Sequence, residues 1–119
     1  MPDSIPILRD GKVLFAQGRV ADGFLVRFLG LMGRPDIAAE AALVFPRCNS
    51  IHTLFMRFPI DVVLCDYKGE VVEVVAEMRP WRLLLPRKRV SHVIEMRAGR
   101  CAALGIAAGD RLICEGAWE

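Results

Sequence analysis

Residues 48–61 (CNSIHTLFMRFPID) combine a thiol, an imidazole, two hydroxyl groups and a carboxylate within an otherwise apolar run. Polar groups among residues that become buried cost free energy unless each one finds a hydrogen-bond partner. The segment therefore predicts either a structural hydrogen-bond hub or a binding or catalytic site.

Asp61 is the carboxylate of this segment, and it lies in a predicted strand over residues 60–66. Side chains alternate along a strand, and residues 60–65 are apolar on both faces apart from Asp61. This pattern predicts a central strand that is covered on both sides. An aspartate there needs two or three donors to remain ionised. Asp61 is thus either a structural acceptor of backbone N–H groups or of an arginine, or a residue that lines a cavity as acid, base or ligand contact.

His52, with Thr53 beside it, can act as a general base, a metal ligand or a structural hydrogen-bond donor. Cys48 lies four residues earlier, but in a turn that leads into a strand this spacing does not place both side chains on one face. Zinc would need a further ligand, for which His92 and Cys65 are the candidates. We expect neither a metal nor a cofactor, and the widely spaced cysteines indicate reduced thiols.

A basic loop occupies residues 79–89 (RPWRLLLPRKR), with five basic side chains and no acidic one. The net charge of the chain is +2, so the remainder carries −3. The cations could bind the phosphates of a nucleic acid, and Trp81 could stack on a base. However, three consecutive leucines divide the basic residues, which favours a solvated sheet edge with protective charges over nucleic-acid binding.

The whole chain, residues 1–119, is predicted to form a single domain with an ordinary soluble composition. No window approaches the roughly 18 apolar residues of a membrane span. The first residues carry no signal-peptide features, so we expect a cytoplasmic protein.

Short apolar runs separated by turn residues predict a mainly β fold. Short strands at this spacing favour a closed or nearly closed sandwich or barrel. A helix is expected near residues 23–33 and a short helical turn near 100–105. The strands are expected at residues 12–17, 42–45, 51–56, 60–66, 70–75, 81–85, 90–97 and 111–115.

Several segments, in this order, resemble domain-of-unknown-function family 192. They are residues 30–34 (GLMGR), 43–46 (LVFP), 48–53 (CNSIHT), 55–63 (FMRFPIDVV), 79–82 (RPWR), 92–96 (HVIEM) with 98–99, 105–106 and 109–110. The resemblance covers about residues 20–115. It implies a small β-sandwich or barrel of jelly-roll type and brings no activity with it.

Mixed apolar walls with a few convergent polar groups are typical of ligand sites. We therefore expect a non-enzymatic binding domain whose pocket holds a small polar or anionic ligand, or the loop of a protein partner. The expected ligand-binding residues are His52, Thr53, Met56, Asp61, Trp81 and Arg82.

Two alternatives remain open. One is an enzyme of the hydrolase or isomerase type, in which His52 and Asp61 transfer protons. The other is a structural hub whose partner docks through the basic loop of residues 79–89. The sequence specifies neither catalytic residues nor an oligomeric state.

Overall fold

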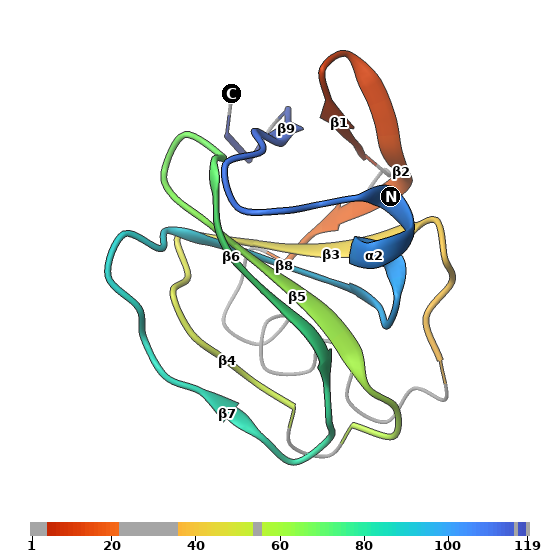
Figure 1. Ribbon diagram of the computed structural model, residues 1–119, viewed down its shortest axis with the longest axis vertical. Coiled ribbons are helices and arrows are strands. Elements are labelled where there is room, and N and C mark those ends of the chain that lie inside the picture. The colour runs from red at the N-terminus through yellow and green to blue at the C-terminus, as the bar shows by residue number, and fades with distance from the viewer. Residues whose placement is uncertain (1–4, 22–35, 54–55, 116, 119) are drawn as a thin grey trace.

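A seven-stranded sheet forms the centre of the computed structural model, which describes residues 5–21, 36–53, 56–115 and 117–118 (Figure 1). The strands are β1 (Ile5–Arg9), β2 (Lys12–Val20), β3 (Ala41–Pro46), β4 (Ile51–His52), β5 (Ile60–Cys65), β6 (Val71–Met78), β7 (Leu83–Leu84), β8 (His92–Arg97) and β9 (Ile113–Cys114), and the helix α2 (Arg100–Leu104) follows β8. The sheet has the order β6-β5-β8-β3-β2-β1-β9, while β4 and β7 form a separate ribbon. Among the strand pairs of the described residues, only β2–β3 is parallel.

Strand β5 lies in the interior of the sheet between β6 and β8, and all six of its residues are buried. Val63 and Cys65 belong to a first core, which also contains Cys101 of α2. Val62 and Leu64 belong to a second core on the opposite face, beneath the β4–β7 ribbon. The predicted central strand, covered on both sides, is confirmed. Each fully buried aliphatic side chain contributes roughly 1.5–3 kcal/mol.

Opposite ends of the molecule carry different parts of the fold (Figure 1). The β1–β2 hairpin and β9 lie at one end, and the β4–β7 ribbon lies at the other. Strand β1 was not predicted, because Pro6 interrupts its apolar pattern. The register of the β1–β2 pair shifts around Pro6, where the missing N–H of proline is tolerated.

The fold is mainly β, as predicted, but the seven-stranded sheet is not closed into a barrel. Within the described part of the chain, the edge strands β6 and β9 do not pair with each other. An isolated bridge joins Glu70, just before β6, to Arg111, two residues before β9. Next to this bridge, the Val71 N–H donates to the Asp110 carbonyl oxygen at 2.7 Å. The jelly-roll type implied by the family resemblance stays a prediction.

Two of the predicted strands, at residues 51–56 and 81–85, differ most from the structure. Among the described residues of these segments, only the two-residue strands β4 and β7 are present. The Thr53 carbonyl oxygen accepts hydrogen bonds from the N–H groups of Met56 and Trp81. The helical turn near residues 100–105 is confirmed by α2, and the helix expected near residues 23–33 lies outside the described residues.

Gly69 occupies a position that no other residue fits. Its φ is +90°, and a Cβ there would overlap the Trp118 indole nitrogen and the Leu112 carbonyl oxygen. These two groups are joined by an Nε1–H to oxygen hydrogen bond of 2.9 Å. Gly69 therefore allows the C-terminal segment to pack against the turn between β5 and β6.

We expect Gly69→Ala to lower the free energy of unfolding by about 2–4 kcal/mol, through backbone strain plus steric overlap. Gly109→Ala is the matched control, because Gly109 has a φ of +97° and open space around the added Cβ. The control should lose only the free energy of unfolding that corresponds to backbone strain, about 1–2 kcal/mol. Urea unfolding followed by tryptophan fluorescence measures both variants, and equal losses would contradict the steric argument.

Candidate functional site

Asp61 is completely buried, and its carboxylate accepts three backbone hydrogen bonds. Oδ1 accepts from the Glu77 N–H at 2.8 Å, and Oδ2 accepts from Gly99 at 3.1 Å and from Cys101 at 2.9 Å. Gly99 is the N-cap of α2 and has no side chain with which to cap the helix. Asp61 of β5 supplies the missing acceptor for the first turn. These contacts support the structural interpretation of this carboxylate.

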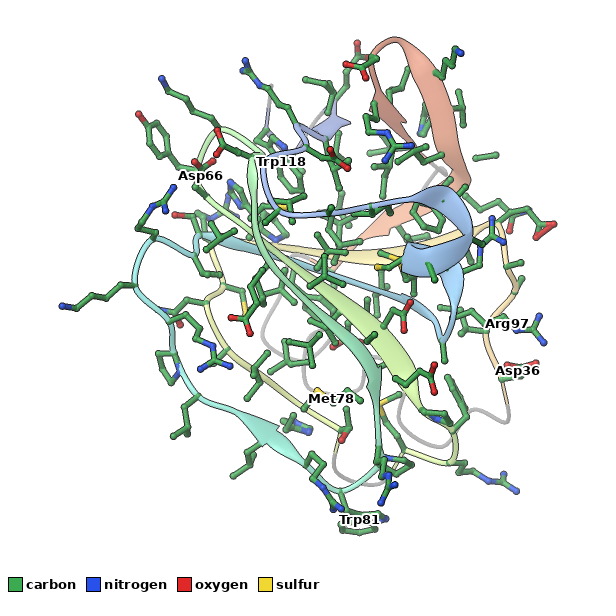
Figure 2. All side chains as sticks on the ribbon, in the orientation of Figure 1. Asp36, Asp66, Met78, Trp81, Arg97 and Trp118 are labelled. Atoms are coloured by element: carbon green, nitrogen blue, oxygen red, sulfur yellow. The ribbon has the colours of Figure 1, made fainter. Side chains whose placement is uncertain are left out.

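Thr53 is likewise buried and holds the turn at residues 79–82 against β4. Its hydroxyl donates to the Arg79 carbonyl oxygen at 2.6 Å and accepts from the Arg82 N–H at 2.8 Å. The backbone of Thr53 adds hydrogen bonds of 2.8 Å with Arg82 and with Trp81. The Trp81 side chain extends away from the body of the molecule at the edge of this turn (Figure 2).

The structure brings Thr53, Trp81 and Arg82 together and places Asp61 elsewhere. The carboxylate of Asp61 points toward α2, on the side of the first core. Strand β4, which carries His52, covers the opposite face, since Ile51 packs against the second core. His52 and Asp61 therefore lie on opposite sides of the sheet, and this geometry does not support proton transfer between them.

Met56 is buried in the second core, and His52 is half-buried opposite Leu83. The ligand-binding role assigned to the six sequence-predicted residues stays a prediction.

A cavity of about 450 Å³ opens on another part of the surface, lined by residues 47–49, Tyr67 and residues 90–92. Three segments meet here because β8 begins between the end of β3 and the end of β5, with His92 paired to both Pro46 and Cys65. The Cys48 N–H donates to the Ser91 carbonyl oxygen at 2.8 Å, which joins two walls.

His92 forms a rigid part of this cavity wall. Its Nδ1 accepts the Arg47 N–H at 3.1 Å, so Nε2 carries the proton and faces the Tyr67 carbonyl oxygen at 3.4 Å. The ring stacks on Trp118, with ring centres 4.3 Å apart and planes 9° from parallel. Burial, assisted by the charge of Arg47, lowers the pKa of His92. The imidazole is therefore neutral near pH 7, with both nitrogens directed at backbone groups.

Cys48 is the half-buried thiol of the cavity, and it donates to the Ser50 carbonyl oxygen at 3.0 Å. Since His92 uses Nδ1 to accept a backbone N–H, the two side chains are not arranged as a nucleophile and its base. The other three cysteines are buried and free, and burial raises their pKa values, to about 12 for Cys65 and Cys101 and about 11 for Cys114. None of these three thiols ionises readily near neutral pH.

Glu95 is a buried carboxyl group that the sequence did not single out. It lies on β8 opposite Leu43 and Val62 and is 4% exposed. Burial raises its pKa to about 8. The alternating pattern of β8 would place a glutamate on a solvated face, but here both faces of the sheet are covered.

The described residues contain no cluster of three or more His, Cys, Asp or Glu side chains that could hold a metal ion. Within the same residues, no helix has the length and apolar character needed to cross a membrane.

The fold and cavity define a small, mainly β domain with an open cavity of mixed polar and apolar lining where β3, β5 and β8 meet. The sequence pattern of domain-of-unknown-function family 192, described as "Uncharacterized ACR", matches residues 7–114, and the chain belongs to this family. The predicted resemblance is therefore confirmed, and the match begins earlier than expected, within β1.

Two relatives agree with this assignment, and a solved structure shares the fold. The chain is 38% identical over 108 residues to a UPF0127 protein of Pyrococcus furiosus, which covers 86% of this chain and 90% of the relative. It is 36% identical over 114 residues to a UPF0127 protein of Pyrococcus horikoshii, covering 89% and 96%. The crystal structure of a protein of unknown function from Novosphingobium aromaticivorans is similar with a TM-score of 0.78 at 22% identity, covering 92% of this chain and 84% of that one. At this identity the structural likeness shows the fold alone.

Proposed function

We propose that this protein is a non-enzymatic binding domain for a small polar or anionic ligand, held in the cavity lined by residues 47–49, Tyr67 and residues 90–92. The observation that carries the proposal is the cavity itself. Its volume of about 450 Å³ falls within the range of small-molecule sites, roughly 300–1,000 Å³. Its lining combines a cation, an amide, hydroxyl groups and the apolar side chain of Val90.

The charge at this cavity favours an anion. Arg47 is an exposed cation of the lining, and a guanidinium binds carboxylate and phosphate groups through paired hydrogen bonds. The lining residues include no acidic side chain. Asp66 lies next to Tyr67 in the sequence, and its Oδ1 accepts the N–H groups of Lys68 and Glu70.

The His92 wall of the cavity is held in place by its contacts, which supports binding more than catalysis. His92 is locked between two backbone groups and Trp118, and its lowered pKa keeps it neutral. A preformed site loses little conformational entropy when a ligand binds. A general base would need a nitrogen that is accessible to the substrate, and both nitrogens of His92 face the backbone.

Isothermal titration calorimetry tests the proposal with inorganic phosphate, di- and tricarboxylates and nucleoside monophosphates. We expect at least one of these compounds to bind, and Arg47→Gln to weaken its binding by about tenfold or more, because a charge-assisted contact is lost. Asn49→Trp should also weaken binding, by filling the cavity with a bulky side chain.

Arg97→Gln is the matched control, since Arg97 lies at the other end of β8 in an exposed ion pair with Asp36 (Figure 2). Trp81→Ala tests the location that was predicted from the sequence. If Trp81→Ala abolishes binding while Arg47→Gln and Asn49→Trp do not, the ligand lies near the sequence-predicted residues and the cavity proposal is overturned. Failure of every compound to bind also overturns it.

A further inference from the structure

Three large apolar side chains stand exposed along one short stretch of the chain. Trp81, Leu83 and Leu85 are 53%, 66% and 68% exposed, respectively. Leu84, between the two exposed leucines, is buried in the second core. The alternation of the strand thus sends Leu84 inward and its neighbours outward.

Cations surround this exposed apolar stretch. Arg79, Arg82 and residues 87–89 are all exposed, and no acidic residue interrupts residues 79–89. Arg87 forms an exposed ion pair of 3.2 Å with Glu73 of β6. This pair balances one of the five positive charges of residues 79–89. We refer to residues 79–89 as the apolar–basic edge.

The apolar–basic edge is held in place from behind. Strand β7 pairs with β4, and the Thr53 hydroxyl bonds to the backbone of both Arg79 and Arg82. Leu84 anchors the middle of the segment in the core. Strand β7 and Trp81 lie at the end of the molecule opposite the β1–β2 hairpin, and the chain after β7 runs along one side of the molecule to β8 (Figures 1 and 2). The part of the edge that carries Trp81 and β7 is therefore presented outward at that end.

We propose that the apolar–basic edge docks onto the surface of an anionic phospholipid bilayer. Tryptophan is favoured at the level of lipid headgroups. Exposed leucines beside it can enter the boundary between headgroups and acyl chains. Arginine and lysine side chains attract anionic headgroups and keep their charges in the polar layer.

This occupant fits the edge better than nucleic acid does. A nucleic acid would use the cations and stack a base on Trp81, but it would leave Leu83 and Leu85 without apolar partners. A bilayer surface offers anionic headgroups to the cations and an apolar layer to the exposed leucines. The proposal is independent of the ligand cavity, which is lined by other residues.

Sedimentation of the full chain with lipid vesicles tests the proposal. We expect binding to vesicles of about 30% phosphatidylserine in phosphatidylcholine, and binding at least about tenfold weaker to phosphatidylcholine alone. Salt at roughly 0.5 M should weaken the binding, because it screens the surface charges. Trp81 emission should shift to shorter wavelength on binding, whereas Trp118 is already buried and should change little.

Two variants separate the apolar and charged contributions. Leu83→Ser/Leu85→Ser should weaken vesicle binding by about tenfold or more, because two insertable side chains are lost. Arg82→Gln/Lys88→Gln should also weaken vesicle binding by about tenfold or more, because the loss of each charge near the membrane surface weakens binding about fivefold. All four side chains are exposed, so both variants should keep their unfolding midpoints. If one variant fails to fold, the other still tests the proposal.

Lys12→Gln/Val13→Ser is the matched control, because it removes an exposed cation and an exposed apolar side chain at the opposite end of the molecule. It should bind vesicles like the unaltered protein. Equal affinity for anionic and neutral vesicles, no binding to either, or tighter binding to a single-stranded oligonucleotide than to anionic vesicles would each overturn the proposal.

Discussion

Replacement of Asp61 by alanine is expected to lower the free energy of unfolding by about 3–5 kcal/mol. The substitution leaves the N–H groups of Glu77, Gly99 and Cys101 without their acceptor. Asp61 and Cys101 are both buried, so water cannot fully replace the carboxylate. Urea unfolding followed by circular dichroism measures the loss.

Asp61→Asn should recover only part of this loss. An amide oxygen can accept from one side, but its NH₂ group would meet a second backbone donor. Asp36→Ala is the matched control, because Asp36 has a 59% exposed side chain in a 3.7 Å ion pair with Arg97. Such an exposed pair contributes about 0–1 kcal/mol. A loss from Asp61→Ala as small as that of the control would show that Asp61 does not organise β5, β6 and α2.

Glu95 should make the protein less stable as the pH rises from about 5 to about 8. Its pKa is raised by burial from 4.5 to about 8, so the folded state holds a proton that the unfolded chain releases. The folded state is therefore favoured most below the unfolded pKa, and this contribution is lost as the pH rises through the folded pKa. At about 1.4 kcal/mol per pKa unit, the total loss is roughly 3–5 kcal/mol.

Glu95→Gln should remove this pH dependence, because the amide matches the shape of the protonated carboxyl and does not ionise. We expect the variant to match the unaltered protein near pH 5 and to be more stable by a few kcal/mol near pH 8. The difference between the two curves isolates Glu95, since the lowered pKa of His92 affects both proteins alike. Glu40→Gln, at an exposed position, should leave the curve unchanged. Parallel curves for Glu95→Gln and the unaltered protein would contradict the argument.

Local sequence patterns predicted the burial of Asp61 and its need for hydrogen-bond donors, but not the identity of the donors. The apolar residues on both faces of 60–66 predicted a buried central strand, and the buried carboxylate was expected to need two or three donors. Both expectations match the structure. The donors themselves lie 16, 38 and 40 residues away, and only the positions of β6 and α2 identify them.

The cavity was missed for a related reason. Arg47, Tyr67 and Ser91 each lie within two residues of the end of a strand, where polar residues are ordinary in a loop. They meet because β8 pairs with both β3 and β5 at His92. A cluster of polar residues at three strand ends would have been a useful signal, but it becomes a site only once the order of the strands is known.

Hydrophobic alternation and motif order are properties of neighbouring residues, and they were sufficient to predict the mainly β class, the family and the burial of β5 on both faces. Tertiary packing was needed to establish the extent of β4 and β7, the open sheet in place of a closed barrel, the separation of His52 from Asp61 and the burial of Glu95. Each of these depends on which distant segments pair in the sheet and which layer covers each face. Pairing and coverage are determined by the free energy of the whole packed chain, to which residues far apart in the sequence contribute.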